Sequence, residues 1–133
     1  MRSNLTALAA GVALFLSAPV FAHHSFEAEY DSNKPINITG SVTKVEWMNP
    51  HARFYVDVKD EKGAVTNWNF ELGSPNVLTR QGWRRDSLKV GDTVSVEGYM
   101  AKDGARLANA RRVTLADGRK VFAGSAAGEG GPQ

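Results

Sequence analysis

Hydrophobic and polar residues alternate over most of the middle of the chain, which is the pattern of β-strands buried on one face. Five strands are predicted, over residues 36–47, 53–59, 64–72, 93–101 and 106–115. The first and the last of these each contain one phase slip, and a slip of one position is typical of a bulged, bent strand. The first slip lies near Gly40, and glycine in a strand often marks such a bend. A hairpin signal at Asp117-Gly118 leads into a further short strand, RKVF.

A short helix is predicted between the third and the fourth strand. Ser74 is a suitable N-cap and Pro75 suits the first helical position, while Gly82 suits the end. The helix has two turns at most, and we expect Val77 and Leu78 to contact the core.

Three strands, a short helix and two further strands are the order of an OB-fold. The sequence therefore predicts an all-β fold, a small OB-like five-stranded barrel with one short helix between strands 3 and 4. A small open β-sandwich is the alternative. Trp47 and Trp68 fall on the inward phase of their strands, and we expect Trp83 to close one end of the barrel.

The start of the chain has the features of a secretory signal peptide. Arg2 is followed by a short apolar run, and Val20 and Ala22 fit the small-residue cleavage rule. The mature protein would begin at His23, lie in the periplasm and keep no membrane anchor. The predicted organisation is residues 1–22 as signal peptide, 23–35 as an N-terminal segment, 36–122 as the β domain and 123–133 as a disordered tail.

Charge and composition exclude several classes of function. The formal net charge is +2, and it falls to +1 without Arg2, which argues against a nucleic-acid surface. The pairs Arg84-Arg85 and Arg111-Arg112 are interpreted as surface charge. The absence of cysteine excludes thiolate metal sites and cysteine nucleophiles. Because no catalytic motif is present, we favour a non-catalytic protein over an enzyme.

The three histidines, His23, His24 and His51, are the main candidates for chemistry. A mature N-terminal His23 would offer its α-amine and its ring Nδ1 to one metal ion, closing a chelate ring. His51, in the connection between the first two strands, would supply a third nitrogen. Three nitrogens in one plane suit the tetragonal preference of Cu(II). This arrangement resembles the histidine brace of lytic polysaccharide monooxygenases and of certain periplasmic copper-binding proteins, but the resemblance does not extend to their folds.

Other residues extend this candidate metal site. His24 is an alternate or axial donor, and Met48 is an auxiliary ligand that would favour Cu(I). Phe26 and Tyr30 could attach the N-terminal segment to the barrel, so that it reaches the rim where His51 lies. The competing interpretation is that the two adjacent histidines are a solvated tail and that His51 only stabilises its turn.

A polar row on strand three is a second candidate surface. Asn67, Asn69 and Glu71 all fall on the outward phase of the strand, where they form either a ligand face or a solvated face.

Several motifs resemble a family of short exported bacterial proteins that carries only a domain-of-unknown-function label. They are the HHSF start of the mature chain, MNPHARFYVDV, WNFELGSPN, VEGYMAKDG and LANARRVTLADGRKVF. The resemblance implies a small periplasmic β domain and supplies no activity. In strand order and length only, the chain is also similar to the periplasmic bacterial OB-fold proteins linked to stress tolerance, which are binding modules.

Three functions follow from the sequence. The favoured one is a periplasmic non-catalytic protein that binds a metal ion, copper above all. The alternative is a metal-free OB-fold module that binds a small ligand or an envelope protein partner. The third is a copper-dependent oxidase or oxygenase.

Overall fold

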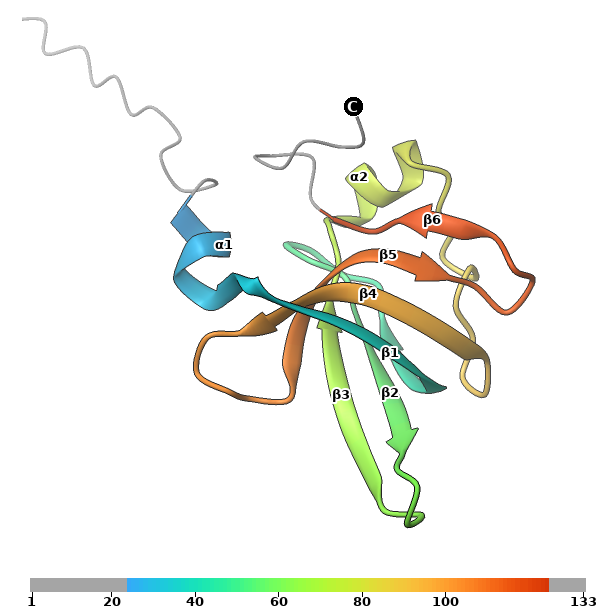
Figure 1. The fold of residues 1–133 in the computed structure, drawn as a ribbon. Helices are drawn as coiled ribbons and strands as arrows, with labels where there is room; N and C mark the ends of the chain where they lie inside the picture. Colours follow the sequence, from blue (N-terminus) through green and yellow to red (C-terminus); the bar gives the residue numbers. More distant parts are fainter. Residues whose placement is uncertain (1–23, 125–133) are drawn as a thin grey trace, which may run out of the picture.

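A computed structural model describes residues 24–124, which form six strands and two short helices (Figure 1). The elements in chain order are α1 (His24–Glu29), β1 (Tyr30–Glu46), β2 (Arg53–Lys59), β3 (Val65–Glu71), α2 (Pro75–Arg80), β4 (Thr93–Ala101), β5 (Leu107–Thr114) and β6 (Lys120–Phe122). Within residues 24–124, neither helix is long and apolar enough to cross a membrane. The predicted signal peptide, His23 and most of the predicted tail lie outside the described residues.

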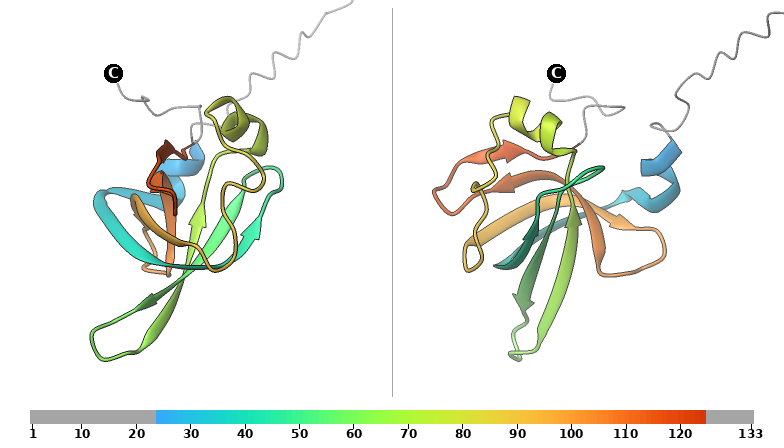
Figure 2. Two further views of the ribbon diagram at one scale, coloured as in Figure 1. Left: turned by 90° about the vertical axis from the view of Figure 1, so that its right-hand side faces the viewer. Right: turned by 180° about the vertical axis from the view of Figure 1, so that it is seen from behind.

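Five of the strands pair into a ring. The sheet runs in the order β3-β2-β1-β4-β5-β6, and an additional parallel pairing joins β3 to β5. The remaining pairings are antiparallel, and β6 extends the sheet from β5 (Figure 2). The predicted all-β, OB-like arrangement of five strands is therefore confirmed, with α2 between β3 and β4 as expected.

The hydrophobic core lies inside the ring, where the inward phases of all five strands meet. Phe54 and Phe70 are fully buried and stack with ring centroids 5.2 Å apart. Trp68 and Trp83 are buried as predicted, while Trp47 is half-buried against the core. The indole nitrogen of Trp83 donates a hydrogen bond of 2.7 Å to the Phe122 carbonyl, which ties the connection after α2 to β6.

Helix α2 begins and ends where the sequence predicts. The Ser74 hydroxyl accepts a hydrogen bond from the Val77 amide, and Pro75 is the first helical residue. Gly82 has a φ of +94°, which suits glycine just beyond a helix end. Leu78 is fully buried and Val77 is half-buried, so this short helix is held by packing as well as by its cap.

Both predicted phase slips correspond to irregular pairing. The β1–β2 register shifts between Val42 and Lys44, and the β4–β5 register shifts between Glu97 and Gly98. Near the first shift, a Cβ on Gly40 would stand 2.3 Å from the Asp57 carbonyl oxygen. Glycine is therefore required where the bent β1 approaches β2 closely.

The N-terminal segment is more regular than the sequence pattern indicates. Strand β1 begins at Tyr30, six residues before the predicted start at residue 36, and α1 precedes it directly. Tyr30 pairs with Ala101 of β4 and is only 2% exposed. Phe26 packs on Tyr30 and on Tyr99, with ring centroids 5.6 and 5.9 Å apart. Pairing with β4 and aromatic packing therefore hold the N-terminal segment on the sheet, although residues 31–35 are all polar or proline.

Candidate functional site

The connection between β1 and β2, which carries His51, lies at the upper end of the ring in Figure 1. Its backbone continues the β2–β3 pairing beyond the last strand residues. The Ala52 amide donates to the Gly73 carbonyl at 3.1 Å, and the Leu72 amide donates to the Ala52 carbonyl at 2.9 Å. The Asn49–Pro50 peptide in this connection is cis. The two hydrogen bonds of Ala52 hold the backbone next to His51 against the residues that follow β3.

The His51 ring is also held by a hydrogen bond of its own. Its Nδ1 lies 3.0 Å from the carbonyl oxygen of Leu72. A carbonyl oxygen only accepts, so Nδ1 must carry the hydrogen in this contact. In the neutral ring the lone pair is then on Nε2. The side chain is 33% exposed, so a histidine of defined tautomer stands at the surface.

A buried ion pair stands behind His51. The Glu71 side chain, at the end of β3, has one carboxylate oxygen 3.9 Å from His51 Nδ1. Its other oxygen accepts a hydrogen bond from Arg53 Nη2 at 2.5 Å. The two residues are cross-strand partners on β2 and β3. Glu71 is only 8% exposed, and a buried carboxylate requires such a partner.

Tyr30 adds a neutral phenol to this ion pair. Burial, followed by the negative charge of Glu71, raises the pKa of the Tyr30 hydroxyl well above its usual range. The phenol therefore stays protonated at every physiological pH. Its oxygen has no hydrogen bond of normal geometry within residues 24–124, and the same holds for the side-chain oxygens of Asn69 and Asn109. These buried polar atoms lie on or near the β3–β5 pairing, where Glu71 is opposite Asn109.

The other predicted metal donors are placed less completely. His23 lies outside the described residues, and of His24 only the backbone is described, as the first residue of α1. Met48 is 54% exposed in the same connection as His51. In the part of the chain that the structure describes, no three His, Asp or Glu side chains gather as a metal cluster.

The predicted polar row on β3 is not one uniform face. Asn67 is exposed and donates to the Asp57 carboxylate at 2.7 Å and to the Thr43 hydroxyl at 3.2 Å. Asn69 is half-buried, and Glu71 is buried in its pair with Arg53. Only Glu71 is brought close to His51.

Sequence reasoning missed three participants in this site: Arg53, the Leu72 carbonyl and Tyr30 as a partner of Glu71. Arg53 carried a usable signal. It falls on the outward phase of its strand, as Glu71 does on the next strand, and opposite charges on neighbouring strands suggest a cross-strand pair. A backbone carbonyl carries no residue-specific signal at all.

Comparison with known proteins supplies a family and no function. No curated protein matches the chain. A family model described as "Family of unknown function (DUF6152)" matches residues 12–110 and so spans most of the chain. The predicted resemblance to a family that is known only by a domain-of-unknown-function label is confirmed at this level. The chain belongs to the family of unknown function DUF6152.

Proposed function

We propose that this protein is exported to the periplasm and, after cleavage at Ala22, binds a copper ion without catalysing a reaction. The donors would be the α-amine and ring of His23 together with Nε2 of His51. The observation that carries the proposal is the 3.0 Å hydrogen bond from His51 Nδ1 to the Leu72 carbonyl. Histidines that ligate metals almost always donate their other ring N–H to a carbonyl or carboxylate in this way.

The position of the N-terminal segment supports the same proposal. Helix α1 begins at His24, the residue after His23, and it lies at the same upper end of the ring as the β1–β2 connection (Figure 2). Phe26 fastens it by its contacts with Tyr30 and Tyr99. The Lys102 amide also donates to the Glu29 carbonyl at 2.8 Å, so the end of α1 is held to the β4–β5 connection. These contacts hold α1 on the body of the protein.

The donor set explains the choice of metal. Nitrogen donors without thiolates suit Cu(II) better than a structural zinc site. His24 would be the alternate or axial donor, and the exposed thioether of Met48 would assist Cu(I). Affinity should fall in acid, because the amine and imidazole donors bind metal only when deprotonated.

The titration that tests the proposal compares protein that begins at His23 with its His51→Ala and His24→Ala variants. Cu(II) binding would be followed by the visible d–d band and by EPR. We expect His51→Ala to lose more affinity than the 10- to 100-fold that loss of an outer-shell partner costs. The matched His24→Ala variant should lose less and keep the same EPR signal. Weak binding that is alike in all three proteins would refute the proposal.

A separate assay distinguishes the carrier from the enzyme. Copper-loaded protein would be given a reductant and oxygen, and peroxide formation would be measured. The proposal expects no more peroxide than an equal amount of copper bound to a simple peptide chelator. Sustained turnover that depends on His51 would favour the copper oxidase or oxygenase instead.

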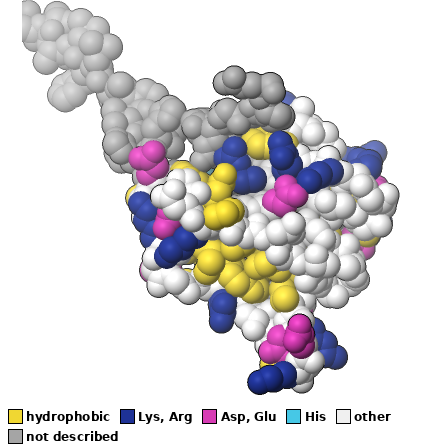
Figure 3. All heavy atoms as spheres, in the orientation of Figure 1, with side chains coloured by type: hydrophobic (Ala, Val, Ile, Leu, Met, Phe, Trp, Pro, Cys, Tyr) yellow, Lys and Arg dark blue, Asp and Glu magenta, His cyan; other side chains and the backbone are white. Residues whose placement is uncertain are grey.

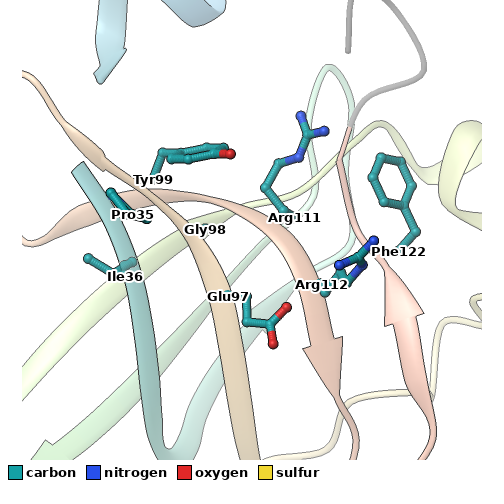
Figure 4. A pocket seen from close by; sticks show the side chains of 8 residues that line it. All are labelled: Pro35, Ile36, Glu97, Gly98, Tyr99, Arg111, Arg112 and Phe122. Atoms are coloured by element: carbon teal, nitrogen blue, oxygen red, sulfur yellow. The ribbon is translucent and has the colours of Figure 1, made fainter. Parts of the chain in front are cut away.

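The metal-free alternative, a module for a small ligand or an envelope partner, is favoured by a different feature, a groove on the outer face of the sheet. This groove runs over β4, β5 and β6 and the adjoining part of β1, away from His51, and Glu97, Tyr99 and Arg112 are among the residues that line it (Figure 4). Its volume is about 360 Å³, at the small end of the range for ligand pockets. In Figure 3, Lys and Arg side chains gather over the same strands around an acidic one, with hydrophobic side chains beside them. A ligand of this groove should bind wild-type and His51→Ala protein alike, because the groove and His51 share no residue.

A further inference from the structure

The hydrogen on His51 Nδ1 has two acceptors beside it, and they differ in charge. The Leu72 carbonyl oxygen lies 3.0 Å from Nδ1, which is a hydrogen bond. The Glu71 carboxylate oxygen Oε1 lies 3.9 Å from the same nitrogen, which is too far for one. The ring therefore donates to the neutral acceptor, although a hydrogen bond to the charged one would be stronger.

Arg53 explains why the carboxylate stays away from the ring. Its Nη2 donates to the other carboxylate oxygen of Glu71, Oε2, at 2.5 Å. The two residues are direct cross-strand partners, so sheet pairing fixes both backbones. Because the guanidinium holds Oε2, the carboxylate cannot turn Oε1 toward His51 without giving up its shortest hydrogen bond.

Burial makes this hold on Glu71 necessary. The Glu71 side chain is only 10% exposed, whereas the Arg53 side chain is 31% exposed and reaches the surface. A buried carboxylate needs a hydrogen-bond donor, so loss of Arg53 would leave Glu71 in need of another. The donors beside it are His51 Nδ1 and the buried Tyr30 hydroxyl, whose pKa is raised by burial and then by the charge of Glu71.

The identity of the acceptor matters for a metal ion on the opposite ring nitrogen, Nε2. A hydrogen bond from Nδ1 raises the basicity of a histidine ligand, and a carboxylate acceptor does so more than a carbonyl. A more basic nitrogen favours Cu(II) over Cu(I), because the ion of higher charge gains more from it. With the Leu72 carbonyl as acceptor, His51 would discriminate less strongly between the two oxidation states.

We propose that Arg53 is a positioning residue, which holds Glu71 away from His51 so that the ring donates to the Leu72 carbonyl. Its consequence for copper rests on the proposed function, whereas the geometry itself does not depend on a metal ion. By this role Arg53 keeps His51 a moderate donor, and bound copper stays open to reduction and release.

The test observes the His51 ring by NMR in metal-free, ¹⁵N-labelled protein that begins at His23, with His51→Ala to identify the signals. At about pH 8, where an ordinary imidazole is neutral, the ring nitrogens report the tautomer. The Nδ1–H proton reports the acceptor, because the shorter hydrogen bond to a carboxylate moves it downfield. Wild type and Glu71→Gln should both show the Nδ1–H tautomer with similar proton shifts. A large upfield move in Glu71→Gln would overturn the proposal, because Glu71 would then be the acceptor.

Variants of Arg53 test its role. Arg53→Met should move the Nδ1–H proton downfield, and combining it with Glu71→Gln should return the signal to its wild-type position. Arg85→Met, at an exposed arginine elsewhere, is the control and should change nothing. If Arg53→Met does not fold, Arg53→Lys, which replaces the planar fork by one ammonium, should move the signal the same way by less. An unmoved signal in the folded Arg53 variant, or a double variant that stays shifted, would overturn the proposal.

A measurement on copper-loaded protein separates this inference from the proposed function. The reduction potential of bound copper should fall in Arg53→Met and recover when Glu71→Gln is added. If wild-type protein does not bind copper, the proposed function fails, while the NMR result on the metal-free ring still decides the role of Arg53. If copper binds but no Arg53 variant moves the Nδ1–H signal or the potential, the positioning role alone is refuted.

Discussion

The His51 end of the ring and the groove over β4–β6 present their polar groups in opposite ways. His51 is one ring, fixed by the Leu72 carbonyl and backed by the buried Glu71–Arg53 pair. The groove has its acidic residue, Glu97, paired with Lys120 Nζ at 2.7 Å on an open face. The first is rigid and incomplete, because one nitrogen alone does not hold a metal ion. The second is exposed to water, where charge pairs are screened.

Binding affinity would therefore have a different physical origin at each of the two sites. At the His51 end, affinity would come from preorganised donors and from the chelate ring that the chain start closes. In the groove, affinity would come from charge and apolar contact, and it would be modest and sensitive to salt. Perturbations should therefore separate the two sites.

Gly98→Ala should be the most damaging substitution. The new Cβ would clash with the Asn109 carbonyl, and we expect a loss of about 3 kcal/mol in the free energy of unfolding. Gly104→Ala is the matched control, because among residues 24–124 nothing lies within 4 Å of its Cβ and only its φ of +79° is unfavourable, at about 1–2 kcal/mol. Urea unfolding of both variants measures this. Equal losses would mean that the close approach at the bulge is not required.

Glu71→Gln should weaken the His51 end and leave the groove intact. Arg53 would lose its charged partner, which we expect to lower the free energy of unfolding by about 2 kcal/mol. Copper affinity should fall about tenfold, as for loss of an outer-shell group. Glu61→Gln, in the exposed turn between β2 and β3, is the control. Shifts of the Glu97 and Tyr99 amide NMR signals in Glu71→Gln would show that the two sites are coupled.

Tyr30 should make the fold sensitive to alkali. Its pKa is raised in the folded protein, so the folded state keeps the phenolic proton after the unfolded chain has released it. Stability is therefore complete below about pH 10, the ordinary tyrosine value, and falls by about 1.4 kcal/mol per pH unit above it. Urea midpoints at pH 9 to 11 should separate wild type from Tyr30→Phe, which lacks this loss. Parallel curves for the two proteins would contradict the buried, neutral phenol.

Glu97→Gln should have the smallest effect, and on the groove alone. Loss of its exposed ion pair with Lys120 should lower the free energy of unfolding by about 0–1 kcal/mol. The loss should shrink as sodium chloride is raised, because salt screens the interaction. Copper binding should stay the same. A loss in urea unfolding as large as that of Glu71→Gln would mean that burial does not distinguish the two ion pairs.

Local sequence patterns predicted most of this fold. The alternation over residues 53–59 and 64–72 identified β2 and β3, and Ser74 with Pro75 identified α2. The start of β1 was missed because its exposed residues 32–35 lack an apolar phase, and because it pairs with β4, 64 to 71 residues away in the chain. The parallel β3–β5 pairing that closes the ring is likewise a long-range contact, and it followed only from the analogy of strand order.

For the candidate sites too, the sequence predicted residue types and positions but not the contacts that depend on distant parts of the chain. His51 was identified from residue type and position, but its tautomer depends on the Leu72 carbonyl, which no sequence pattern reveals. Arg111 and Arg112 were interpreted as surface charge, as part of the argument against a nucleic-acid surface. The predicted phase slip in the last strand lies between Ala110 and Val113, where the β4–β5 register shifts.

The proposed copper site depends on the chain start, whose α-amine would complete it at His51. The most direct measurement is Cu(II) EPR and affinity for two proteins, one that begins at His23 and one with a single alanine placed before it. The added residue moves the α-amine away from His23 and leaves His51 and its Leu72 hydrogen bond in place. We expect the extended protein to lose tight binding and the EPR signal of a three-nitrogen site, with an unchanged circular dichroism spectrum. Equal affinity and the same EPR signal in both proteins would contradict it.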